Sequence, residues 1–349
     1  VPTIGGQNES LAPKAVIDWL NGRAKGFSTR TGSEEVKATW STGKVGMIGT
    51  SYDGILSLAA ATTGVEGLEV IMPTALVSNW YDYYRANGLV RSPGGYLGED
   101  MDVLYDGINT GEESKRESNN QRVRDSILIA GQDRITGDYN DFWEGRNLLT
   151  QLDSVKTPVL MTHGFNDWNV MPSQSLNLYD SLKAKGLHVG LHLHQFGHGG
   201  DAGLERMNTW FTKYLHGADN GAENDTIVLI EHLTSRGFKE HEYLSFPDEN
   251  AEMLKFYASV VDGEFKLLPS ERCTDSIVSI IDEPKLKYNK LRLEKNQDHR
   301  LLLKGDTLFD KIRISGTVQV KMRIACSDSA ANISAYLLSL PWEEVKPNF

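Results

Sequence analysis

Gly49-Thr50-Ser51-Tyr52-Asp53-Gly54 is the stretch that decides the fold of this 349-residue chain. The residues before it, Lys44-Val45-Gly46-Met47-Ile48, are typical of a buried parallel strand. The residues after it, 55–61, are rich in alanine and leucine and predict a helix that packs against that strand. A strand that turns at once into a helix strains the residue at the turn, and the two glycines allow the elements to approach closely. Ser51 is therefore expected to stand exposed at the end of the strand.

This arrangement is that of the nucleophile elbow of α/β-hydrolases, Gly-x-Ser-x-Gly, with its second glycine one position later. An elbow serine becomes a strong nucleophile when a histidine takes its proton and a carboxylate fixes the tautomer of that histidine. In α/β-hydrolases the acid follows the serine, the histidine comes last, and each lies after a strand. Asp167 follows the predicted strand 155–162, and His198 follows the predicted strand 187–194. The sequence therefore predicts a triad of Ser51, Asp167 and His198 at the carboxyl edge of a parallel sheet.

Other residues near these loops compete for the same roles. His163 precedes the predicted acid and is expected to pack behind the site. Asp53 lies too close to the serine to orient the histidine and is expected to be solvated or to act as a charge at the helix N-terminus. Structural or surface roles are expected for three histidines that share one face of the last predicted parallel strand, where a metal site would need an open face: His188, His192 and His194. No metal ion is predicted.

Composition bounds the class of protein. With 349 residues, of which 40% are apolar, the chain can bury one or two cores, and its length predicts two domains. A net charge of −11 argues against a nucleic-acid partner. Cys273 and Cys326 lack metal-like spacing, and two buried free thiols in a reducing compartment are expected, with one disulfide as the alternative. No apolar run is as long as a membrane span, so a cytoplasmic protein without membrane contact is expected.

Hydrophobic periodicity predicts a hydrolase domain over 1–221. Strands that alternate with helices indicate a parallel sheet; the strands are expected at 44–48, 68–73, 155–162 and 187–194, and the helices around 15–20, 55–61, 172–185 and 203–216. Residues of about 86–150 hold helical pieces around 121–130 and 138–149, which indicates a lid inserted over the active site. Nothing in 1–43 supplies the strands that normally precede the nucleophile strand, so the chain is expected either to begin within this domain or to borrow the missing strands from elsewhere.

After residue 221 the pattern changes to short β-type runs separated by polar turns. Such spacing predicts an antiparallel, jelly-roll-like β-sandwich over 222–349. Its strands are expected at 227–230, 254–261, 277–281, 291–293, 301–303, 312–314, 318–324 and 333–340. Because the chain stops soon after the last run, the sandwich is expected to be cut short. The predicted class is an α/β-hydrolase sheet with a helical lid insertion, followed by a β-sandwich.

Four longer stretches carry a more specific signal: Gly43–Tyr52, Ala60–Glu69, Trp80–Gly95 and His163–Val170. They resemble the X-prolyl dipeptidyl aminopeptidases, serine peptidases that release Xaa-Pro dipeptides from peptide N-termini. The resemblance covers nearly the whole chain. The stretch Trp80–Gly95 separates this family from hydrolases of the cocaine-esterase and glutaryl-acylase type, which look similar mainly around the triad. The resemblance implies an exopeptidase that needs no metal or organic cofactor, acts on proline-containing peptides and forms a homodimer.

The resemblance also assigns catalytic roles. It implies Ser51 as the nucleophile, Asp167 as the orienting acid and His198 as the general base. The backbone N–H of Tyr52 would help to form the oxyanion hole. The second oxyanion donor of the family is a tyrosine hydroxyl from a region upstream of residue 1.

Substrate-binding roles follow from the same resemblance. Trp80, Tyr83 and Val170 match positions that wall the proline pocket, Glu99 matches the carboxylate that binds the free N-terminal ammonium, and Asn169 lies close by in the sequence motif. A proline ring is flat, apolar and without an N–H, so its recognition falls to aromatic packing and shape. A fixed carboxylate one dipeptide away from the nucleophile would set the register of cleavage.

Two other functions stay open at this point. An ester or amide hydrolase of the cocaine-esterase or acylase type would share the triad without the need for an N-terminal anchor. A hydrolase-like fragment without activity, which only binds or folds with partner chains, is the alternative from another class.

Overall fold

The computed structural model describes residues 4–340 apart from 87, 94–98, 110, 227, 235–236, 271–276, 284, 287, 292–297, 311, 330 and 332. The chain divides into two compact units, one of residues 1–245 with 320–349 and one of Phe246–Gln319. The first unit contains the main sheet and all the predicted site residues.

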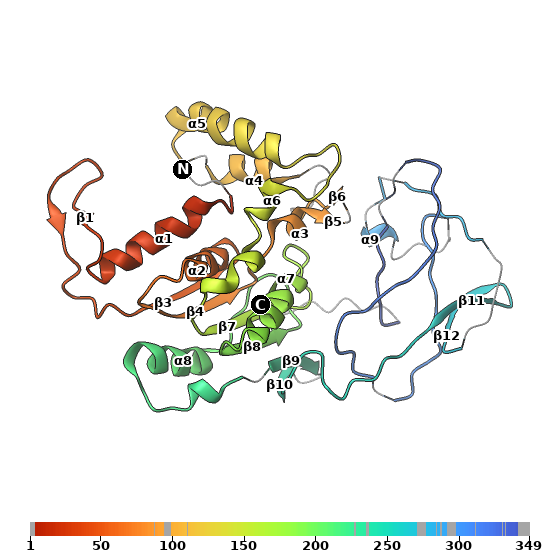
Figure 1. Ribbon diagram of the computed structural model, residues 1–349. Coiled ribbons are helices and arrows are strands. Elements are labelled where there is room, and N and C mark those ends of the chain that lie inside the picture. The colour runs from red at the N-terminus through yellow and green to blue at the C-terminus, as the bar shows by residue number, and fades with distance from the viewer. Residues whose placement is uncertain are drawn as a thin grey trace. The chain divides into compact units, whose positions relative to one another are not determined.

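A six-stranded sheet forms the centre of the first unit, in the order β10-β9-β8-β7-β4-β3 (Figure 1). Its strands are β3 Val45–Thr50, β4 Leu68–Thr74, β7 Val159–Gly164, β8 Val189–His194, β9 Val228–Thr234 and β10 Gly237–Tyr243. All pairs are parallel except that of β9 with β10. Every residue of β7 and β8 is buried, as expected for central parallel strands that are covered on both faces. The predicted parallel sheet is confirmed.

Helices cover both faces of this sheet. They are α1 Gln7–Leu20, α2 Tyr52–Thr62, α7 Ser173–Ala184 and α8 Leu204–His216, at the places where the sequence predicted helices. Helix α2 packs on β3, β4 and α1, whereas α8 packs on the opposite side of β3 and β4 (Figure 1). Helix α1 begins at Gln7, well before the segment 15–20 around which the sequence predicted a helix.

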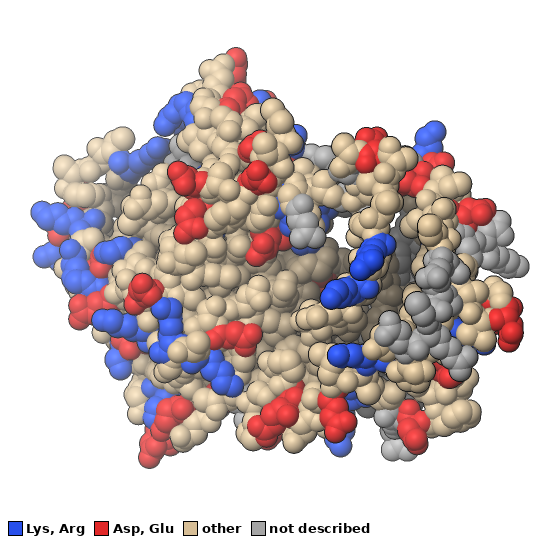
Figure 2. Space-filling model, turned by 45° about the vertical axis from the view of Figure 1, so that its right-hand side comes forward, with Lys and Arg blue, Asp and Glu red and all other residues tan. Residues whose placement is uncertain are grey.

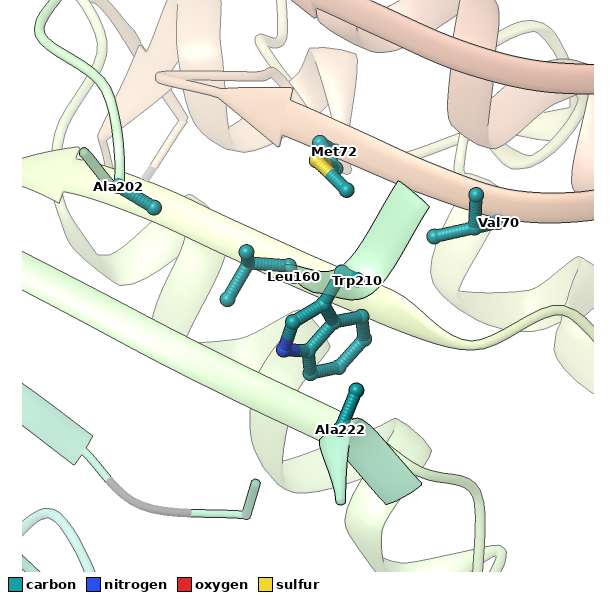
Figure 3. Close-up of a cluster of buried hydrophobic side chains, with 6 residues drawn as sticks. All are labelled: Val70, Met72, Leu160, Ala202, Trp210 and Ala222. Carbon is teal, nitrogen blue, oxygen red and sulfur yellow. The ribbon is translucent and has the colours of Figure 1, made fainter. Parts of the chain in front are cut away.

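Trp210 on α8 is the centre of the apolar layer beneath the sheet. Its buried ring faces Leu160, with Val70 and Met72 of β4 beside it (Figure 3). Val70 and Met72 share one face of β4 because successive residues of a strand point to opposite sides. The indole Nε1 donates a hydrogen bond of 2.7 Å to Asp225 Oδ2, so the polar atom of this large side chain is satisfied.

A mostly helical insertion joins β4 to β7. Its elements are α3 Trp80–Tyr84, β5 Arg85–Ala86, β6 Leu89–Val90, α4 Met101–Ile108, α5 Glu113–Asn119, the π-helix η1 Asn120–Ile129, α6 Asp141–Glu144 and the 3-10 helix η2 Leu148–Ser154. The helical pieces expected around 121–130 and 138–149 correspond to η1, α6 and the start of η2. Helix α3, the first element of this insertion after β4, was not predicted from the sequence.

The first strand expected in the β-sandwich belongs to the main sheet instead. Strand β9 pairs in parallel with β8, Val228 opposite Leu191, and both Val228 and Ile230 are buried there. Strand β10 then returns antiparallel as the edge of the sheet. The boundary at 221/222 was therefore placed too early, because a short apolar strand looks the same in sequence whether it joins a parallel sheet or a sandwich.

The second unit contains a β hairpin of β11 Tyr257–Val261 and β12 Glu264–Leu268, and the short helix α9 Tyr288–Leu291. An α/β-hydrolase sheet followed by a β unit is thus confirmed as the class. Among the described residues of 277–340 no further strand forms, and large apolar side chains there are exposed, Ile277 and Phe309 each to 94%. Alternating apolar residues form a strand only when another layer covers their apolar face.

Some smaller expectations are also settled. Cys326 is an exposed free thiol, so the prediction of a buried one is wrong for this residue, and Cys273 lies outside the described residues.

Within the described part of the chain, no helix has the length and apolar character needed to cross a membrane. On the face shown in Figure 2, the described acidic and basic side chains are interspersed. Between α1 and β3, the short strand β1 Gly26–Phe27 pairs antiparallel with β2 Glu35–Val36.

Gly49→Ala is expected to destabilise the protein by roughly 1–3 kcal/mol. A Cβ at Gly49 would lie 2.4 Å from the carbonyl carbon of Asp53, which belongs to the backbone of α2 and cannot move aside. Gly107→Ala is the matched control, because no atom lies within 4 Å of its Cβ position in α4, and alanine favours a helix there. Denaturant unfolding measures both, and equal free energies of unfolding would contradict the close approach of strand and helix.

Candidate active site

The register of the sheet brings the predicted triad residues to one edge. The last residues of β3 and β4, Thr50 and Thr74, are paired, and the ends of β4, β7 and β8 follow in the same direction. Ser51 comes directly after β3, while Asp167 and His198 lie on the loops after β7 and β8. The carboxyl ends of parallel strands form the usual ligand-binding edge of such a sheet.

Ser51 has the strained backbone expected of an elbow. Its φ is 59° and its ψ is −121°, a combination that a residue with a side chain rarely adopts. Its N–H donates a hydrogen bond of 2.8 Å to the carbonyl of Thr74, which ties the turn to β4. Helix α2 begins at the next residue, so the N–H groups of its first turn surround the serine.

His198 and Asp167 are in direct contact. His198 Nδ1 lies 2.6 Å from Asp167 Oδ2, and the two N–H groups of Asn169 and Val170 donate to Oδ1 at 3.0 and 2.9 Å. Burial alone raises the pKa of the Asp167 carboxyl, but hydrogen bonds from His163, His198 and the Val170 N–H outweigh it and hold this pKa well below its usual value. Asp167 is therefore an ionised acceptor that fixes the orientation of the imidazole.

A working triad also needs a hydrogen bond between the Ser51 hydroxyl and the His198 ring. Among the described residues no hydrogen bond joins the Ser51 hydroxyl to the His198 ring. Hydrogen bonds of this kind are often long in unliganded enzymes and tighten when substrate binds. The structure thus brings the predicted acid and base together and places the predicted nucleophile at the same sheet edge.

An aromatic cluster lies beside the elbow. Trp80 is buried and packs against Tyr52 and Tyr83, each with 5.7 Å between ring centroids, and it stacks on Tyr84. The Tyr83 hydroxyl donates a hydrogen bond of 2.9 Å to Asn169 Oδ1, two residues after the acid. Burial, and then the charge of Glu99, raise the pKa of Tyr83 to about 12. The predicted proline-pocket residues are therefore linked to the acid loop.

Two adjacent carboxylates of the insertion have different surroundings. Asp100 is fully buried and accepts two hydrogen bonds from Arg85, of 3.0 and 2.9 Å, and it also caps α4 through the N–H of Met101. Glu99 is 8% exposed, and its charge adds to the burial that raises the pKa of Tyr83 and of Tyr84. Asp100 therefore serves the internal structure of the insertion, and Glu99 faces the aromatic cluster.

Glu9 is a site neighbour that the sequence did not predict. Its buried carboxylate accepts hydrogen bonds from the Tyr52 hydroxyl at 2.7 Å and from the N–H of Gly5 at 2.8 Å. Burial, and then the negative charge of Glu9, raise the pKa of Tyr52 strongly. Arg146, whose pKa burial lowers to about 10, donates to the carbonyl of Ile4 and is attracted by Glu9. No local signal marks a pair separated by 43 residues.

Gln174 is a second unpredicted residue, at the start of α7. Its side-chain oxygen accepts hydrogen bonds of 2.9 Å from the N–H groups of Ser78 and Asn79, and its amide donates to the Asn79 carbonyl at 3.0 Å. These bonds fix the turn from which α3, and with it Trp80, begins. A lone glutamine inside a helical pattern gives no sequence signal for this function.

The other candidate histidines lie apart from the triad contact. His192 and His194 are buried in β8, and the His188 ring stacks on Trp210 with 4.4 Å between centroids. Asp53 is exposed in the first turn of α2. Within the part of the chain that the structure describes, no group of three or more His, Cys, Asp or Glu side chains is arranged to hold a metal ion.

Comparison with known proteins adds the following. A family model described as X-Pro dipeptidyl-peptidase (S15 family) matches residues 1–200. The chain is 47% identical to a putative Xaa-Pro dipeptidyl-peptidase of Rhodopirellula baltica over 99% of its own length and 55% of the relative. It is 34% identical to the Xaa-Pro dipeptidyl-peptidase of Ligilactobacillus salivarius, over 93% of its own length and 43% of the length of that relative. The chain thus spans about half the length of the curated relatives it matches.

Solved structures support the fold alone. A CocE/NonD family hydrolase from Staphylococcus aureus matches with a TM-score of 0.54 and 17% identity, over 77% of this chain and 44% of that one. At this level of identity the match concerns the α/β-hydrolase architecture and not the substrate.

Asp100→Asn is expected to lower the free energy of unfolding by about 3–5 kcal/mol, because it leaves the Arg85 guanidinium buried without its counter-charge. Glu112→Gln is the matched control, since it breaks the exposed ion pair with Lys115 and should change stability little. Chemical denaturation measures both variants. Equal small losses would contradict the view that the Arg85–Asp100 pair holds the insertion together.

Proposed function

Because the chain belongs to the X-Pro dipeptidyl-peptidase (S15) family, we propose that it is the catalytic part of a serine exopeptidase that releases Xaa-Pro dipeptides from the free N-termini of peptides. The observation that supports this most directly is the 2.6 Å contact of His198 Nδ1 with Asp167 Oδ2, on the loops that share a sheet edge with the Ser51 elbow. The proposal treats these three residues as the triad.

In the proposed acylation step, Ser51 Oγ attacks the carbonyl carbon of the penultimate proline. His198 Nε2 takes the hydroxyl proton, while Asp167 holds the proton on Nδ1 and stabilises the imidazolium that forms. The Tyr52 N–H, at the start of α2, would donate to the oxyanion. The C–N bond then breaks, and His198 returns its proton to the departing amine.

Deacylation would repeat these transfers with water. His198 takes a proton from the water molecule, the resulting hydroxide attacks the ester carbonyl, and the Ser51 oxygen leaves with the proton from His198. The sum is the hydrolysis of one peptide bond, and the chain's own side chains supply every proton transfer.

We propose that the substrate is held by the aromatic cluster and by Glu99. The rings of Trp80 and Tyr83, with Val170, would pack on the proline ring, which offers shape and no N–H. The Glu99 carboxylate would pair with the N-terminal ammonium, and Asn169, which is bonded to Tyr83, would lie between the two subsites. Proline-containing peptides are therefore the proposed substrates, and the expected homodimer and cytoplasmic location stay predictions.

Ala-Pro-p-nitroanilide is expected to be cleaved by the whole protein at least 100-fold faster than its N-acetylated form. The acetylated substrate lacks the ammonium that the Glu99 carboxylate would bind, so one charge-assisted interaction with the substrate is lost. Release of nitroaniline measures both rates, with Ser51→Ala as the inactive control. Equal rates would favour an esterase or amidase of the cocaine-esterase or acylase type.

A fluorophosphonate probe separates these enzyme functions from a binding role. The proposal predicts covalent labelling of Ser51 in the whole protein and no labelling of the Ser51→Ala variant. Intact mass measures the adduct. A protein that neither labels nor cleaves either anilide would be the inactive hydrolase-like fragment.

Glu99→Gln is expected to lower kcat/KM for Ala-Pro-p-nitroanilide by about 10- to 100-fold, mostly through KM, because one charge-assisted pair with the ammonium is lost. The rate for the acetylated substrate should change little, so the preference for free N-termini shrinks. Glu113→Gln, an exposed carboxylate in α5 of the same insertion, is the matched control. Undiminished preference in the Glu99 variant would remove this residue from the proposed anchor.

A further inference from the structure

His163 is a buried imidazole behind the proposed triad acid. It lies on β7 with no exposed surface. Its Nε2 is 2.9 Å from the Val170 carbonyl oxygen and 3.4 Å from Asp167 Oδ2, and its Nδ1 is 2.7 Å from the Ser175 hydroxyl on α7. The ring thus contacts both ends of the 167–170 turn and the helix that packs against it.

These partners fix the tautomer of the ring. A carbonyl oxygen and an ionised carboxylate can only accept hydrogen bonds, so Nε2 carries a proton. Val170 and Asp167 share this N–H donor. The buried Ser175 hydroxyl can then donate to Nδ1. In this arrangement the Nε2–H lies 3.4 Å from the Asp167 oxygen that also contacts His198.

We propose that His163 is a positioning residue of the active site, which holds Asp167 ionised and fixes the turn that presents Asn169 and Val170 to the substrate. The inference rests on the proposed function. Asp167 Oδ2 is the atom on which the two imidazoles converge, and Oδ1 is occupied by the N–H groups of the same turn. His163 therefore acts through Asp167 and the turn, without contact with substrate.

The charged and titratable groups around Asp167 determine the sign of the effect. His198 and His163 contact it directly, and Arg91 and Tyr83 from the insertion interact with it at longer range. Removal of the His163 donor destabilises the carboxylate, so a proton binds the Asp167–His198 pair more tightly. Activity needs this pair without the extra proton, so the acidic limb of the pH profile moves to higher pH.

A space-filling role of the buried ring predicts a different result. If the imidazole only fills space, its replacement would lower the free energy of unfolding, and the protein that still folds would keep the pH profile of its activity. His163→Leu removes the donor at similar volume, whereas His163→Gln keeps an amide N–H near the position of Nε2. His192→Leu is the matched control, because His192 is equally buried on the adjacent strand β8, opposite Thr162.

The rate of Ser51 labelling by a fluorophosphonate, measured against pH in the whole protein, tests the proposal, with kcat/KM for Ala-Pro-p-nitroanilide as the second profile. In His163→Leu we expect the acidic limb to rise by about one pH unit and the rate on that limb to fall about tenfold. His163→Gln should restore most of the original position of the acidic limb and most of the rate on it. His192→Leu should leave the acidic limb in place. An unmoved limb in a folded His163→Leu protein overturns the proposal.

Ser175→Ala decides the matter if His163→Leu does not fold. It removes the hydroxyl that holds Nδ1 of His163 in place, so the ring behind Asp167 is held less firmly, and it should raise the acidic limb by a smaller amount in the same direction. An unchanged limb in this variant also overturns the proposal. Labelling does not depend on the peptide substrate, so a protein that labels but does not cleave the anilide refutes the peptidase function and still tests His163.

Discussion

The buried carboxylate of Asp167 is the constraint on which the site depends. A carboxylate that is 2% exposed keeps its charge only if nearby donors replace the water it has lost. The loop after β7 supplies two N–H groups, β7 supplies His163, and the loop after β8 supplies His198. The fold of these segments and the ionisation of the acid therefore require each other, since a turn of another shape would leave the charge uncompensated.

The insertion between β4 and β7 is tied to this acid loop by side chains. The Tyr83 hydroxyl bonds to Asn169, and Gln174 at the start of α7 holds the Ser78–Asn79 turn that leads into α3. Residue 175, next in the chain, holds His163. The first turn of α7 thus supports both the aromatic cluster and the carboxylate, so movement of the insertion relative to the sheet would disturb the two together.

Local patterns predicted the parts of the molecule that local forces determine. The glycines at the elbow, the apolar strands and the helices between them follow from steric and hydrophobic rules. The order of serine, acid and histidine then predicts that the three proposed triad residues lie at one sheet edge. Glu9, Gln174 and the contact of His163 with Asp167 could not be predicted, because they depend on how distant elements pack. The same limit applies to β9, whose apolar residues do not encode which sheet they join.

Glu99 and Asp100 show how structure separates residues that sequence cannot. Both are acidic, adjacent and buried, and from the sequence either one could be the carboxylate that binds an ammonium. Asp100 already receives two hydrogen bonds from Arg85 and one from Arg134, so its charge is balanced within the insertion. The charge of Glu99 acts on Tyr83, a ring proposed to border the substrate, and on Tyr84, whose ring packs against Tyr83. A cationic ligand beside those rings would therefore be attracted by Glu99, while the two arginines offset the charge of Asp100.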